Sequence, residues 1–125
     1  MRTTILVLAL CAMAVVGIHG QPKPALHLAV TGESNLRSNF IESLKTAAGE
    51  DKLDIEIVPR TDPTLTFTVI IAQETTIGSA AAAVIALDRS GDVAASVVRS
   101  GRFSGRGALN ACAKELIKKL LVLAR

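Results

Sequence analysis

Apolar residues along this chain recur at two different spacings, and the order of those spacings limits the folds open to it. Five segments alternate apolar and polar residues, or run apolar without a break, as β-strands do. Two further segments repeat apolar residues every three or four positions, as amphipathic helices do. The predicted strands are 25–31, 53–57, 65–72, 80–87 and 92–100, and the predicted helices are 34–49 and 108–124.

The predicted order is therefore strand, helix, four strands, helix. Each helix has one apolar face, and the simplest way to bury both is an α+β two-layer sandwich with both helices on one face of a five-stranded mixed sheet. Ser34 or Asn35 is expected to cap the first helix, and Gly49 to end it. A loop is expected over 74–78, and the turn at 88–91 joins two apolar runs as a hairpin.

The first twenty residues predict a secretory signal peptide. Arg2 precedes the apolar run 5–16, and the small residues of 17–20 suit cleavage by a signal peptidase. The run is shorter than the roughly 20 residues that cross a bilayer. We therefore expect an exported protein, periplasmic or secreted, that meets a membrane only before cleavage. An extended lead-in follows at 21–24, and a single domain at 25–125.

The cysteine count bears on where the protein works. Cys11 lies within the predicted signal peptide, which leaves Cys112 alone in the exported chain. No intramolecular disulfide is available, so stability has to come from packing. Small animal domains outside the cell commonly carry several disulfides, so the pattern favours a bacterial periplasm.

Composition argues against several classes of ligand. The chain has a formal net charge of +3, and its basic residues are spread along the sequence rather than clustered, unlike those of a nucleic-acid-binding face. It has no Trp or Tyr and only three Phe, so it has little with which to stack on sugars or bases. We expect no nucleic acid among its partners.

The residues that catalysis would need do not form a coherent set. His27 is the one histidine after the predicted signal peptide, and it has no neighbouring cysteine or carboxylate cluster with the spacing of a metal site. Cys112 lies on the apolar stripe of the last helix, where burial disfavours a reactive thiolate. We expect a non-enzymatic protein with no metal or cofactor. A small hydrolase with an unrecognised Ser nucleophile stays open as a minor alternative.

An arginine- and glycine-rich segment offers a second function. Arg99, Arg102 and Arg106 alternate with glycines just before the last helix. Free backbone N–H groups and the positive end of the helix dipole attract anions at such a place. The alternative hypothesis is therefore a binder of an anionic envelope ligand.

The face of the sheet opposite the helices is the predicted interaction face. No further element is left to cover it, and about half of its residues are apolar. Because a monomer rarely leaves a large apolar patch in water, we expect the face to meet an envelope protein or a second copy of the chain. Its expected members are Thr66, Thr68, Ile70, Val84, Ala86, Ala94, Ser96 and Val98.

The second half of the chain resembles a known family. The Asp-x-x-Gly turn within 87–92, the next strand with Arg99, and the final helix with its run 114–120 are similar to the closing half of small bacterial envelope domains of the TolB amino-terminal type, which also occur in curli-secretion accessory lipoproteins. The resemblance implies an assembly or interaction module and supplies no catalytic residue.

Overall fold

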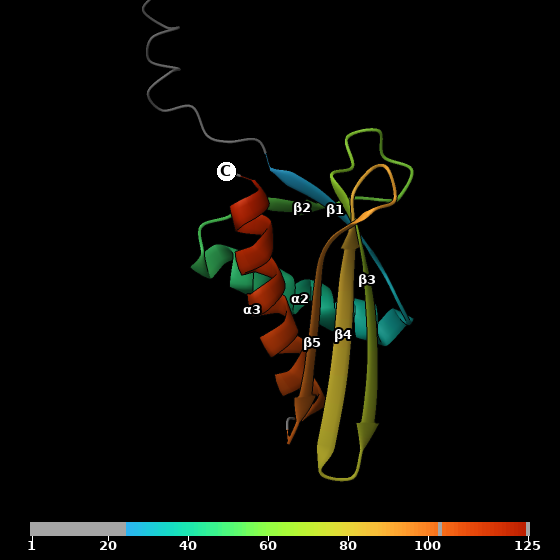
Figure 1. The fold of residues 1–125 in the computed structure, drawn as a ribbon, viewed down its shortest axis with the longest axis vertical. Coiled ribbons are helices and arrows are strands. Elements are labelled where there is room, and N and C mark those ends of the chain that lie inside the picture. Colours follow the sequence, from blue (N-terminus) through green and yellow to red (C-terminus); the bar gives the residue numbers. More distant parts are fainter. Residues whose placement is uncertain (1–24, 103, 125) are drawn as a thin grey trace, which may run out of the picture.

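Five strands form one mixed sheet in the order β2-β1-β3-β4-β5, with two helices packed against it (Figure 1). The computed structural model describes residues 25–102 and 104–124, so the predicted signal peptide and lead-in lie outside the described residues. The elements are β1 (Leu26–Thr31), α2 (Ser34–Glu50), β2 (Ile55–Ile57), β3 (Phe67–Thr76), β4 (Ser79–Leu87), β5 (Val93–Gly101) and α3 (Gly105–Leu123).

The predicted α+β fold class and order of elements are confirmed. Strand β1 pairs in parallel with both β2 and β3, whereas β3, β4 and β5 form an antiparallel meander. The parallel pairing of β1 with β2 requires a crossover connection, which α2 supplies. Neither described helix is long and apolar enough to cross a membrane.

Side-chain caps fix where each helix begins. The Glu33 carboxylate accepts a hydrogen bond from the Leu36 N–H at 3.1 Å, so Glu33 caps α2 in place of the predicted Ser34 or Asn35. The Ser104 hydroxyl accepts from the Gly107 N–H at 2.9 Å, so α3 starts three residues earlier than predicted. Both contacts satisfy an N–H group that has no partner within its helix. Beyond α2 the chain turns at Lys52, with φ 56°, rather than at Gly49.

The core lies between the sheet and the two helices. Phe40 and Leu44 of α2 and Leu116 of α3 are fully buried there, together with Val69 and Val84 of the sheet. Each such side chain contributes about 1.5–3 kcal/mol when it leaves water. Both helices therefore cover the same face of the sheet, as the sequence predicts.

The β3–β4 turn is tighter than predicted. Strand β3 continues to Thr76 and pairs with Ser79, which leaves only Ile77 and Gly78 in the turn, and Gly78 has a φ of 78° that favours glycine. In this register Val84 lies opposite Ile71. Val84 is fully buried, so its predicted place on the interaction face is wrong.

Two further members of the expected interaction face lie elsewhere. Ala86 pairs with Val69 and is fully buried under the helices. Ala94 is the extra residue of a β-bulge, because Ala86 pairs with Ala95 and Leu87 pairs with Val93. Ala94 lines a hollow together with Lys118 and Val122 of α3.

Gly32 offers a test of the packing at the end of β1. A Cβ at this position would lie 2.9 Å from both the carbonyl oxygen and the Cγ2 of Ile71. We expect Gly32→Ala to lower the free energy of unfolding by about 1–3 kcal/mol, because the backbone has to shift to admit the methyl group. Urea denaturation followed by circular dichroism measures the change.

Gly49→Ala is the matched control. Nothing lies within 4 Å of a Cβ added there, and the residue lies in α2. Because alanine favours helix over glycine, this variant should gain about 0.5–1 kcal/mol. Equal midpoints for the two variants would contradict the close approach of Gly32 to Ile71.

Candidate functional site

The side chains of β3, β4 and β5 that point away from the helices form what we call the open face. Four rows cross all three strands, as the register of the two antiparallel pairs requires, and Thr76 with Ser79 adds a fifth row on β3 and β4 only. From the β4–β5 turn to the β3–β4 turn, the four rows are Thr68, Leu87 and Val93; Ile70, Ile85 and Ser96; Ala72, Ala83 and Val98; and Glu74, Ala81 and Ser100.

The open face exposes large apolar side chains. Ile70 is 39% exposed, Ile85 38%, Val93 61% and Val98 65%. Within the described ranges no helix or strand packs over them, since α2 and α3 both lie on the opposite face (Figure 1). Contiguous apolar surface of this kind marks binding sites more often than isolated exposed residues do.

A loop covers the neighbouring part of the same side of the sheet. Residues 58–66 cross β1 on their way from β2 to β3: the Val58 N–H donates to the Leu28 carbonyl at 2.9 Å, and the Thr66 N–H donates to the His27 carbonyl at 2.8 Å. Ala29 is only 2% exposed although it points away from the helices. The expectation that nothing covers this side is therefore wrong at β1. On this side of the sheet the exposed apolar area is confined to β3, β4 and β5.

Polar contacts hold the loop in place. Nδ1 of His27 lies 3.1 Å from the Thr64 carbonyl, which only accepts, so this nitrogen carries the proton. The Asp62 carboxylate accepts from the N–H and the hydroxyl of Thr64 at 2.7 and 2.5 Å. These hydrogen bonds lower the pKa of Asp62 below its ordinary value. His27 and Asp62 thus hold the loop 58–66 against β1.

Charged residues stand at the two ends of the open face. Arg60 of the loop and Arg89 of the β4–β5 turn line a hollow of about 240 Å³, together with Thr68, Ile70 and Asp88. The Asp88 carboxylate accepts hydrogen bonds from the N–H groups of Ser90 and Asp92 within the turn. At the other end Glu74 borders a shallow hollow of about 230 Å³ with a floor of alanines. Among the described residues Arg60, Arg89 and Glu74 form no ion pair. No sequence motif marks Arg60, Arg89 or Glu74 as functional candidates.

The predicted interaction residues divide between the two sides of the sheet. Thr68, Ile70 and Val98 lie on the open face. Thr66 precedes β3, where its half-buried hydroxyl accepts from the His27 N–H at 3.1 Å. Val84 lies under the helices. Ile85 takes the place that Val84 was expected to hold, and the length of the β3–β4 turn is the signal that would have identified it.

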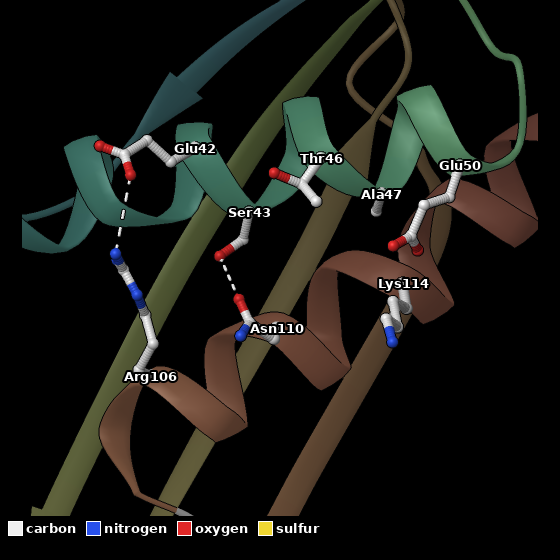
Figure 2. Close-up of a pocket in the computed structure, with 8 residues that line it drawn as sticks. All are labelled: Glu42, Ser43, Thr46, Ala47, Glu50, Arg106, Asn110 and Lys114. Carbon is white, nitrogen blue, oxygen red and sulfur yellow. Dashed lines mark hydrogen bonds and ion pairs between the residues drawn. The ribbon is translucent and has the colours of Figure 1, made fainter.

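The three predicted anion-binding arginines do not converge. Arg99 lies 2.9 Å from the Glu115 carboxylate of α3. Figure 2 shows Arg106, which lies 3.6 Å from the Glu42 carboxylate of α2. Arg102 is exposed beyond the end of β5. Two of the three guanidinium groups thus already face a carboxylate, and the two carboxylates belong to different helices.

A groove of about 360 Å³ separates α2 from α3. Figure 2 shows Glu42 and Glu50 on the α2 side and Arg106 and Lys114 on the α3 side. Between these charges the Ser43 hydroxyl donates to Oδ1 of Asn110 at 2.6 Å. The acidic and basic side chains balance one another, so the groove offers no concentrated charge of either sign. We interpret it as the polar rim of the packing between the helices.

The sheet separates Cys112 from His27. Cys112 is fully buried on α3, and its thiol contacts the Ala82 carbonyl at 3.5 Å. Burial raises the pKa of this thiol. His27 points to the other side of the sheet, so the two residues do not form a nucleophile and base. Among the described residues no three His, Cys, Asp or Glu side chains are grouped to hold a metal ion.

No protein-family model matches the chain, and no curated protein matches it.

The burial of Cys112 predicts its reactivity. A thiol reagent should label the native protein slowly and the denatured protein rapidly, and Cys112→Ala should cost about 1 kcal/mol of stability. Folding raises the thiol pKa above its ordinary value of 9.0, so wild type should lose stability relative to Cys112→Ala as the pH rises past that value. Rapid labelling of the native protein, followed by mass spectrometry, would contradict this placement.

Proposed function

We propose that this chain is a non-enzymatic interaction domain of an exported protein, and that it binds another protein surface through its open face. The observation that carries the proposal is the exposure of Ile70, Ile85, Val93 and Val98 in adjacent rows of three strands. Burying such side chains is worth about 25 cal/mol per Å² of apolar area, a gain that only a partner can supply.

The shape of the open face favours a protein over a small molecule. Its two hollows measure only about 230 and 240 Å³, and alanines form the floor of the first. Small ligands are usually enclosed by concave pockets that cover most of their surface. An extended apolar face with charges at its ends instead has the layout of a protein interface, in which an apolar centre is surrounded by a polar rim.

Other features of the chain support the proposal. The predicted signal peptide and the similarity to bacterial envelope domains both favour an interaction module that works outside the cytoplasm. The candidate anion site at Arg99, Arg102 and Arg106 is a weaker alternative, because Glu115 and Glu42 already neutralise two of its three charges. We therefore place the binding function on the open face.

Two exposed valines give a matched test. Val98 is 65% exposed on the open face, and Val122 is 63% exposed on α3. A photo-crosslinking residue at Ile85 should form an adduct with a defined protein, identified by mass spectrometry, when the chain is expressed in its host. We expect Val98→Glu to abolish the adduct, because a buried charge without a partner opposes docking.

Val122→Glu is the control and should leave the adduct yield unchanged. Both substitutions lie at exposed sites, so each should change the free energy of unfolding by less than about 0.5 kcal/mol. Thermal unfolding of the purified variants checks this. Failure of Ile85 to form any adduct, or equal loss of the adduct in both variants, would contradict the proposed role of the open face.

A further inference from the structure

We propose that the occupant of the open face is a second copy of this chain, packed face to face about a two-fold axis perpendicular to the strands. The inference rests on the proposed function and names its partner. In this arrangement each strand of one copy lies over the same strand of the other, running in the opposite direction. The order of the four rows is thereby reversed between the copies.

Shape complementarity supports this arrangement. The open face has a bulky half, made by Ile70, Ile85 and Leu87, and an alanine half, made by Ala72, Ala81 and Ala83. The hollow of about 230 Å³ lies over the alanine half. The two-fold axis places the bulky half of each copy over the alanine half of the other. Large side chains then enter a space that small ones leave, as close packing requires.

Charge complementarity supports the same arrangement. The loop 58–66 and the β4–β5 turn project at one end of the sheet, and the β3–β4 turn lies at the opposite end (Figure 1). Reversal of the rows brings Glu74 of each copy over Thr68 of the other, at the mouth of the hollow between Arg60 and Arg89. A carboxylate without an ion-pair partner among the described residues thus meets two guanidinium groups that equally have none. The pairing occurs twice, once at each end.

A two-fold axis parallel to the strands would give neither the shape complementarity nor the charge complementarity. It would leave each row over the same row of the other copy, so bulky side chains would meet bulky ones and alanines would meet alanines. Because this axis exchanges β3 and β5, Glu74 would lie over Ser100 of the second copy, away from Arg60 and Arg89. The distribution of side chains on the open face therefore selects the axis perpendicular to the strands.

The small size of the open face favours a weak dimer. Standard strand spacings give three strands and four rows a footprint of about 14 by 26 Å. The footprint covers about 360 Å², less than half of the roughly 800 Å² that each partner contributes to an interface of standard size. We therefore expect a dimer that dissociates in the micromolar range.

Charge reversal tests both the partner and the axis. Sedimentation velocity of the purified protein should show a dimer whose fraction rises with concentration. Glu74→Arg alone, and the double variant Arg60→Glu with Arg89→Glu, should each raise the dissociation constant about tenfold or more, because each puts like charges together at both ends. Mixing the two variants should restore a dimer, since each pairing then joins opposite charges.

Glu50→Arg, on α2 and remote from the open face, is the matched control and should dimerise like wild type. A wild-type protein that stays monomeric at hundreds of micromolar would overturn the inference. A dimer that ignores the reversals, or variants that fail to pair when mixed, would also overturn it. If the wild type is monomeric while Ile85 crosslinks to a different protein, the proposed function stands and only the second copy is excluded.

Discussion

The pairing of β3 with β4 determines which side chains meet the helices and which meet water. A turn of only Ile77 and Gly78 sets this register, so a slip of one residue would exchange the two faces of β4. Val84 and Ala86 would then leave the core, and Ile85 would enter it. Strand β4 lies between β3 and β5, so its facing also decides which of its side chains lie beside those of the outer strand on each face. The core and the open face are thus two results of one backbone constraint.

Strong periodicity made most of the fold predictable from the sequence. The two helices and the order of strands follow from repeats that only one structure satisfies. Strand β4 is different, because the run 80–87 is apolar at every position. Its sequence therefore does not show which side chains face the helices and which face water. Thr68, Ile70 and Val98 could therefore be assigned to the open face, whereas Val84 could not. The path of the loop 58–66 over β1 depends on tertiary hydrogen bonds, which no local pattern encodes.

Alanines serve opposite purposes on the two faces of β4. Ala80, Ala82 and Ala86 are buried beneath the helices, where the thiol of Cys112 in α3 reaches the Ala82 carbonyl. Ala81 and Ala83 alternate with them and leave the open face shallow. Alanine is a poor strand former, and here β4 is held by hydrogen bonds to neighbours on both sides. One residue type therefore allows close helix packing on one face and makes room on the other.

The β-bulge at Ala94 affects the size of the assemblies that the protein can form. The two edges of the sheet are β2, with only three residues, and β5, which the bulge makes irregular. Short and bulged edges are poor templates for the addition of further strands, the route by which sheets grow into fibres. Once a partner covers the open face, no second partner can bind there. An edge strand that pairs with an added strand instead leaves that strand as a new edge, to which another can add. The location of the exposed apolar surface on a face rather than along an edge therefore favours an assembly of finite size.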